Sequence, residues 1–344
     1  MQPGCFTALI TPFDHDNTID HAGLERLVAF QIESGITGIL AVGTTGESPT
    51  LNWDEHIETI DAVARQTRNR CICIAGTGSN NTAETLDATG HAVKSGCSAV
   101  LLVDPYYNGP SSLEIRREYV EPVARAYPET DVIPYVIPGR TGAQLFAEDL
   151  AILNEQFDNV GAVKEATGNL ENMKHTRRCC GDDFLIFAGD DGITYDLMTD
   201  PAIAGAGAIS VMSNIVPRAM TEMVQSILNG RPEAARDTYD RLRPLFEIVS
   251  VKTTETTPHG EVTCRARNPL PIKALMQLLG LPAGGCRQPL GKMTKNGIET
   301  VIDAARRVQQ NAPEVLQPAA EFFNIDIEAR LNNPKIDKLI YSAY

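Results

Sequence analysis

Short apolar runs alternate with longer amphipathic segments through the first 230 residues. The runs have the length and the β-branched content of buried strands, and the segments between them repeat their apolar positions with helical spacing. The predicted strands are 5–12, 38–42, 71–75, 99–103, 132–137, 161–165, 185–188 and 208–211. The predicted helices are 20–34, 54–68, 82–95, 112–126, 147–156, 170–179, 192–200 and 216–229. Repeated strand–helix units over this length predict an α/β fold of the (β/α)8 (TIM) barrel type.

A doubly wound parallel sheet is the alternative. That fold usually has fewer repeats and a glycine-rich phosphate-binding turn after its first strand. Here the first strand runs into Thr11-Pro12-Phe13-Asp14, which contains no glycine. The barrel is therefore preferred.

The pattern changes after about residue 230. Helical spacing returns at 233–251, 271–279 and 294–311, and a polar stretch at 253–268 separates the first two segments. We expect a catalytic barrel at 1–230 and a C-terminal helical domain at 231–344. The extended tail, from about residue 313, is expected to be loose or to dock on a partner.

Composition narrows the classes of function. The net charge of the 344 residues is -14, which disfavours nucleic acid and anionic membranes as partners. No apolar run approaches the roughly 20 residues of a membrane helix, and the N-terminus lacks a signal-peptide pattern, so we expect a cytoplasmic protein. The eight cysteines form no CxxC pair. We expect free thiols and no metal site.

One strand contains a lysine in its middle. Lys164 lies in Val160-Gly161-Ala162-Val163-Lys164-Glu165-Ala166, a run that is otherwise typical of a buried strand. Alternation places Lys164 on the same face as the small Ala162 and Ala166, which leaves room for a ligand. Burial would lower its pKa and yield a neutral amine that can form a Schiff base with a carbonyl substrate. The alternative is a lysine inside the barrel that is paired with a carboxylate.

Other polar residues follow the predicted strand ends, where barrel enzymes place their active sites. Tyr135 could relay protons or could be a packed aromatic residue. Arg140 could bind a substrate carboxylate through its planar fork or could form a surface ion pair. The loop 43–48 could bind a carboxylate through backbone N–H groups and the hydroxyls of Thr44 and Thr45.

Six short motifs, in this order and spacing, resemble the dihydrodipicolinate synthase/N-acetylneuraminate lyase family of pyruvate-dependent lyases. They are Gly43-Thr44-Thr45-Gly46-Glu47, Asp104-Pro105-Tyr106-Tyr107-Asn108, Tyr135-Val136-Ile137-Pro138-Gly139-Arg140-Thr141-Gly142, Lys164-Glu165-Ala166, Gly189-Asp190-Asp191 and Asn268-Pro269-Leu270-Pro271-Ile272-Lys273. The resemblance implies a barrel with a C-terminal helical domain, assembled as a homotetramer of two tight dimers or as a dimer. It implies no cofactor and no metal, because the iminium is itself the electron sink.

The resemblance also implies roles for single residues. The implied reaction is the condensation of pyruvate with L-aspartate 4-semialdehyde, in the diaminopimelate route to lysine. Catalytic roles fall to Lys164 (the Schiff base with pyruvate), Tyr135 (proton shuttle), Thr44 (the link between tyrosines) and Tyr107 (supplied to the neighbouring subunit). Substrate-binding roles fall to Thr45 (pyruvate carboxylate), Arg140 (aldehyde carboxylate), and Gly189 and Ile209 (site lining).

Two further expectations depend on the same resemblance. Arg140, in its Pro-Gly-Arg-Thr-Gly context, favours the synthase branch over an aldolase or lyase that acts on a sugar acid, which remains the alternative. Val136 stands where the family often has asparagine, beside Tyr135. Inhibition by L-lysine at a dimer interface is also expected, through Ser48, Trp53, His56, Asn80, Glu84 and Tyr106.

Overall fold

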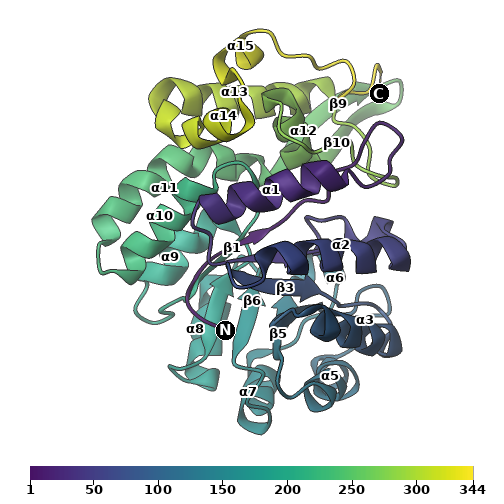
Figure 1. Ribbon diagram of the computed structural model, residues 1–344, viewed down its shortest axis with the longest axis vertical. Coiled ribbons are helices and arrows are strands. Elements are labelled where there is room, and N and C mark those ends of the chain that lie inside the picture. The colour runs from purple at the N-terminus through teal and green to yellow at the C-terminus, as the bar shows by residue number, and fades with distance from the viewer. Residues whose placement is uncertain (344) are drawn as a thin grey trace.

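Parallel strands close into a barrel in the computed structural model, which describes residues 1–343 (Figure 1). Within those residues the strand order is β1-β2-β3-β4-β5-β6-β7-β8, and β8 pairs with β1. The strands are β1 Gly4–Ala8, β2 Gly38–Ala41, β3 Ile72–Gly76, β4 Ala99–Val103, β5 Asp131–Val136, β6 Ala162–Glu165, β7 Leu185–Ala188 and β8 Gly207–Ser210. The predicted (β/α)8 barrel is confirmed, and the doubly wound sheet is not formed.

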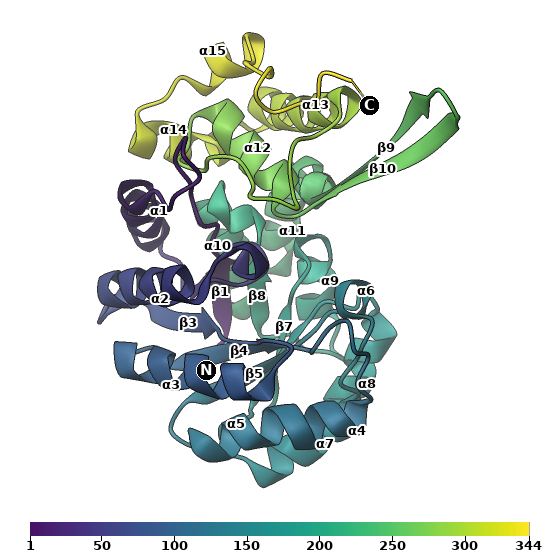
Figure 2. The ribbon, with the colours of Figure 1, turned by 90° about the vertical axis from the view of Figure 1, so that its right-hand side faces the viewer.

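Helices between the strands cover the outside of the barrel (Figures 1 and 2). They are α1 His21–Glu33, α2 Trp53–Thr67, α3 Thr82–Ser95, α4 Ser112–Glu114, α5 Glu121–Ala126, α6 Pro138–Thr141, α7 Ala147–Gln156, α8 Leu170–Cys180, α9 Thr194–Thr199 and α10 Pro217–Leu228. Short 3-10 turns are η1 Ser48–Thr50, η3 Asp191–Ile193 and η4 Met212–Asn214, and a π-helical turn, η2 Ile115–Val120, joins α4 to α5. The side chains of Asn81 and Asn169 cap α3 and α8 by accepting from backbone N–H groups of the first turn.

Alternate strand residues fill the barrel interior. Tyr135, Lys164 and Phe187 are register neighbours on β5, β6 and β7. Phe187 meets Phe6 of β1 edge to face, with ring centroids 5.4 Å apart. Ala162 shares this interior cluster, so the Lys164 face of β6 points into the barrel as alternation predicts.

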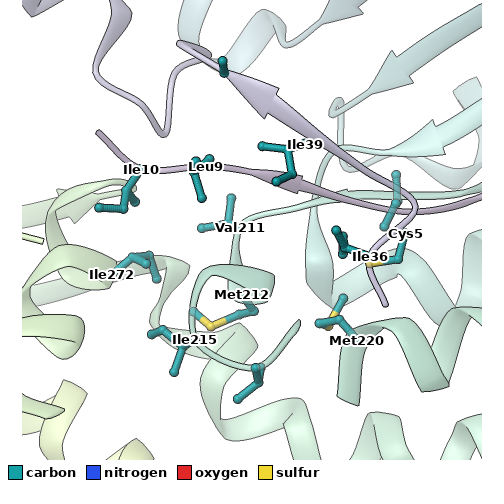
Figure 3. Close-up of a cluster of buried hydrophobic side chains, with 14 of the residues drawn as sticks. Cys5, Leu9, Ile10, Ile36, Ile39, Val211, Met212, Ile215, Met220 and Ile272 are labelled. Atoms are coloured by element: carbon teal, nitrogen blue, oxygen red, sulfur yellow. The ribbon is translucent and has the colours of Figure 1, made fainter. Parts of the chain in front are cut away.

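The C-terminal segment forms a helical layer on the barrel. Its elements are α11 Pro232–Phe246, η5 Glu247–Val249, β9 Ser250–Thr257, β10 Gly260–Arg267, α12 Leu270–Leu279, α13 Lys295–Asn311, η6 Pro313–Val315, α14 Gln317–Phe323 and α15 Ile327–Asn332. Figure 3 shows Ile272 of α12 beside Ile10, Met212 and Ile215, which follow β1 and β8. One apolar core is therefore shared by the barrel and the C-terminal helices. The division into a barrel at 1–230 and a helical domain at 231–344 stays a proposal. Tyr344, the last residue of the predicted C-terminal domain, lies outside the described residues.

Two features differ from the sequence prediction. The polar stretch expected at 253–268 lies within an antiparallel hairpin, β9–β10, whose far end stands clear of the rest of the molecule (Figure 2). Within residues 313–343 the tail is not loose, because Leu331 and Leu339 are buried and α15 contacts α12 and α13. Met293 also donates its N–H to the carbonyl of Leu339 at 2.9 Å.

No helix in the part of the chain that the structure describes combines the length and apolar character needed to cross a membrane. All eight cysteines have free thiols.

Candidate active site

Lys164 lies inside the barrel with only 4% of its surface exposed. Its Nζ stands 4.4 Å from the centroid of the Tyr135 ring on the next strand. Among residues 1–343, no carboxylate forms an ion pair with it. The structure therefore lacks the paired arrangement that was the alternative reading of this lysine.

Burial lowers the pKa of Lys164 to about 7. The buried carboxylate of Asp191 opposes this shift and the guanidinium of Arg140 adds to it. An ordinary lysine has a pKa near 10.5 and is charged at neutral pH. At pH 7 a large fraction of Lys164 is instead a neutral amine, which is the nucleophilic form.

Tyr135 is buried beside this amine, and Thr44 lines the same cavity. Burial raises the pKa of Tyr135, and the nearby Arg140 and the Thr44 hydroxyl partly offset that effect. The phenol therefore stays protonated at neutral pH, and Thr44 supplies a second hydroxyl for proton transfer in the same cavity.

Asn268 connects the two residues predicted to bind carboxylates. Its side-chain Nδ2 donates to Thr45 Oγ1 at 2.9 Å, and its backbone carbonyl accepts from an Arg140 Nη at 2.8 Å. Thr45 and Asn268 are both buried. The sequence contained Asn268 only as part of a motif, and its position between Thr45 and Arg140 depends on a contact across 223 residues.

A buried ion pair holds the 43–48 loop. Glu47 Oε1 accepts from Lys273 Nζ of α12 at 2.7 Å, and the side chains are 0% and 1% exposed. Lys273 also donates to the carbonyl of Thr11 at 3.0 Å, and Glu47 Oε2 accepts from the backbone N–H of Arg287 at 2.9 Å. The positive φ of Glu47, 57°, is maintained within this network. The C-terminal layer thus fixes the loop that contains Thr44 and Thr45.

A cavity of about 200 Å³ opens at this end of the barrel. Its lining includes Thr44, Tyr135, Arg140, Ser48 and Tyr106. Two residues predicted for catalysis, Thr44 and Tyr135, therefore share one hollow with two predicted for lysine binding, Ser48 and Tyr106. Lys164 is not among the lining residues of this hollow and lies deeper, behind the ring of Tyr135.

Two small or apolar positions shape the space around the amine. A Cβ placed on Gly189 would lie 3.1 Å from Lys164 Cε and 2.8 Å from Ala166 Cβ, so only glycine leaves that space open. Ile209 is fully buried in the barrel interior.

Tyr107 does not line the cavity of its own chain. It is 94% exposed and has a φ of 81°, a left-handed conformation that is unusual outside glycine. The adjacent Tyr106 lies at the cavity instead.

The residues predicted to bind lysine form two groups. In the first, Ser48 Oγ lies 3.3 Å from His56 Nε2, and the Trp53 and His56 rings meet at 5.3 Å. Burial lowers the pKa of His56 to about 4, so its imidazole is neutral and can accept a hydrogen bond from an ammonium. Trp53 is 43% exposed, which leaves an aromatic surface open.

The second group follows β3 and β4. Asn80 Oδ1 accepts from the backbone N–H of Tyr106 at 2.7 Å, and Glu84 accepts from Ser79 Oγ at 2.5 Å. Tyr106 is 37% exposed and contributes to the cavity. An amide, a carboxylate and an aromatic ring thus stand on one side of the barrel mouth.

Known proteins match almost the whole chain. The family model described as Dihydrodipicolinate synthetase family matches residues 1–307. A 4-hydroxy-tetrahydrodipicolinate synthase of Syntrophus aciditrophicus is 38% identical over 311 residues, which cover 90% of this chain and 98% of that protein.

Solved structures agree. The 4-hydroxy-tetrahydrodipicolinate synthase of Methylacidiphilum fumariolicum SolV is 34% identical with a TM-score of 0.83, covering 92% of this chain and 99% of that one. The dihydrodipicolinate synthase of Cyanidioschyzon merolae, solved with lysine bound, is 35% identical with a TM-score of 0.80. The match covers 89% of this chain and 98% of that one. These relatives do not favour the sugar-acid alternative. The chain belongs to the dihydrodipicolinate synthetase family.

Proposed function

We propose that the protein is a class I aldolase-type lyase that condenses pyruvate with L-aspartate 4-semialdehyde, the reaction of 4-hydroxy-tetrahydrodipicolinate synthase. The observation that supports this most strongly is the buried, unpaired Lys164 over the ring of Tyr135. The family relatives of the same name add independent support.

The neutral amine of Lys164 attacks the ketone carbon of pyruvate. Loss of water leaves an iminium on the lysine nitrogen, which draws electrons from the adjacent methyl group. Removal of a methyl proton gives an enamine, whose carbon then attacks the aldehyde carbon of the second substrate and forms the new C–C bond. Attack of that substrate's own amino group on the iminium carbon closes a ring and releases Lys164.

Proton transfers in this sequence need a placed hydroxyl. Tyr135 is the register partner of Lys164 on the neighbouring strand, and Thr44 supplies a second hydroxyl in the same cavity. Thr45 and the 43–48 loop are suited to the pyruvate carboxylate, and Arg140 is suited to the carboxylate of the aldehyde. Gly189 leaves the space beside Lys164 that the adduct requires.

The exposure of the Tyr107 side chain supports assembly into a homo-oligomer. Its outward position supports a role in the site of a neighbouring copy, where it would continue the hydroxyl chain of Tyr135 and Thr44. We therefore propose a tight dimer, alone or paired into a tetramer.

L-Lysine is the proposed inhibitor. The neutral His56 can accept from the side-chain ammonium, and Glu84 can bind the α-ammonium. Asn80 and Tyr106 are placed for the carboxylate, and Trp53 can cover the aliphatic stem. Trp53→Ala should abolish inhibition by millimolar L-lysine and leave the uninhibited rate within about twofold. A wild-type rate unchanged by L-lysine, with no heat of binding, would exclude the site.

The experiment that tests the reaction is a steady-state assay with pyruvate and L-aspartate 4-semialdehyde, run beside a sugar aldehyde. We expect turnover of the first pair only. Arg140→Ala should lower kcat/KM for L-aspartate 4-semialdehyde about 10- to 100-fold, the usual cost of a lost charge-assisted contact. Arg241→Ala is the control, because that arginine pairs with Glu314 on the surface. Turnover of the sugar aldehyde alone would contradict the proposal.

A further inference from the structure

The β9–β10 hairpin has one basic face. Lys252 pairs with Arg265 across the two strands, and Ser250 pairs with Arg267. Cross-strand partners share a face, and residues two apart on one strand do as well. Lys252, Arg265 and Arg267 therefore lie on the same side of the hairpin.

The opposite face of the hairpin is the one that packs on the protein. Val251 is buried, Thr253 Oγ1 lies 3.2 Å from Thr294 Oγ1, and Glu255 accepts from Asn296 Nδ2 at 2.9 Å. These contacts fix the hairpin against α13 and the residue before it. Its basic face is left directed away from α13.

The positive charges on that face are not neutralised. Within residues 1–343, Lys252, Arg265 and Arg267 form no ion pair. Glu261 shares the face but is four residues from Arg265, roughly 13 Å along the strand. Like charges directly opposite each other destabilise a strand pair. A cluster of this kind is expected where an anion binds.

The base of the hairpin is joined to the active-site loop by two reciprocal contacts. Arg267 Nη1 donates to the carbonyl of Gly139 at 3.1 Å, and Gly139 precedes Arg140. Arg140 Nη2 in turn donates to the carbonyl of Asn268, the residue after Arg267. Each guanidinium has five N–H donors, so both retain donors for a ligand.

The charges of Arg140 and Arg267 both act on the hydroxyl of Tyr135. They oppose the rise in the Tyr135 pKa that burial causes, and the charge of Arg265 adds to the lowering of the Arg140 pKa that burial causes. The chain as a whole has a net charge of -14. A local cationic mouth on an acidic protein attracts and concentrates an anionic substrate.

We infer that Arg267 is a second substrate-binding guanidinium, which together with Arg140 binds the carboxylate of the aldehyde substrate from two sides. The inference rests on the proposed function, and it assigns the hairpin a part in substrate recognition. Arg265 and Lys252 lie farther along the hairpin from Gly139 and Arg140, and neither is assigned a contact with the substrate.

The test is the kinetics of Arg267→Gln with L-aspartate 4-semialdehyde varied at saturating pyruvate. The KM for the aldehyde should rise about tenfold, and KM for pyruvate should change less than twofold. Arg267→Lys should recover part of the loss, because it restores the charge but not the fork. Lys252→Gln on the same face is the matched control and should stay within twofold of wild type at about 0.15 M salt.

A second readout does not need turnover. Wild-type protein is treated with pyruvate and borohydride, and the heat of binding of succinate, an unreactive dicarboxylate, is then measured. Succinate should bind, and Arg267→Gln should weaken it about tenfold. An unchanged aldehyde KM and unchanged succinate binding in Arg267→Gln, or an equal loss in Lys252→Gln, would overturn the inference.

These outcomes separate the two claims. Absence of a pyruvate adduct on Lys164 would count against the proposed reaction, and succinate binding to the untreated protein would then decide on Arg267. A normal adduct with no effect of Arg267→Gln would leave the reaction standing and remove Arg267 from the site.

Discussion

Two buried lysines in this chain have opposite surroundings. Lys273 is 1% exposed and forms an ion pair with Glu47, so its charge is matched. Lys164 is 4% exposed and lies over the face of Tyr135 without a paired carboxylate. Desolvation without a partner favours the neutral amine, which is reactive. The presence or absence of a paired carboxylate therefore distinguishes Lys273, which has a structural role, from Lys164, the proposed catalytic lysine.

The pH dependence of the rate should follow Lys164. With a pKa of about 7, the amine is mostly protonated below that pH and mostly neutral above it. We expect kcat/KM for pyruvate to rise with pH through about 7, and to fall about tenfold per pH unit well below it.

Asp191→Asn tests the cause of that profile. The Asp191 carboxylate raises the pKa of Lys164, so removing its charge should move the acid limb to lower pH. Asparagine can still accept the backbone N–H bonds that Val211 and Met212 make to Asp191. An acid limb that stays in place, or that moves to higher pH, would show that Lys164 does not control it.

At the scale of elements, the loop after β2 depends on α12. Glu47 and Lys273 are 226 residues apart in the sequence, and the ion pair between them is almost inaccessible to solvent. Removing one member leaves the other charge buried and alone, which costs far more than the pair itself contributes.

Lys273→Met should therefore destabilise the protein by about 3–5 kcal/mol in urea unfolding. The double variant Glu47→Gln/Lys273→Met should regain most of that loss, since no buried charge remains unpaired. Equal destabilisation by the single and double variants would mean that shape, and not charge, explains the effect.

The sequence predicted the barrel strands because they are short apolar runs whose spacing repeats. It missed the β9–β10 hairpin because 253–268 is polar, although β-branched residues such as Val251, Thr253 and Val262 alternate there around the turn at Pro258 and His259. An exposed hairpin has little apolar content, so periodicity alone gives a weak signal.

The same limit applies to the site. Lys164 was identifiable because a charge interrupts an apolar strand. Asn268 and Arg267 contact Thr45 and Gly139, which are far away in the chain, and no local pattern encodes those contacts.

At the scale of the whole molecule, the position of Tyr107 predicts that sites are shared between copies. Tyr107→Phe and Lys164→Ala should each be nearly inactive, because each removes a required group from every site. Co-expressed and purified as a heterodimer, the two chains together contain one complete site, in the barrel that keeps Lys164. The heterodimer should therefore recover about half of the wild-type rate.

The outcome distinguishes two arrangements. If Tyr107 served its own barrel, neither chain of the heterodimer would hold a complete site and the rate would not recover. Recovery would also establish that the active form contains at least two copies.

The proposed reaction requires that Lys164 forms a Schiff base with pyruvate. Borohydride reduction in the presence of pyruvate, followed by peptide mass mapping, tests it most directly. We expect one reduced pyruvate on Lys164, none on the equally buried Lys273, and none at all in Lys164→Ala. An unlabelled Lys164 in the wild type, or an equal adduct in Lys164→Ala, would contradict it.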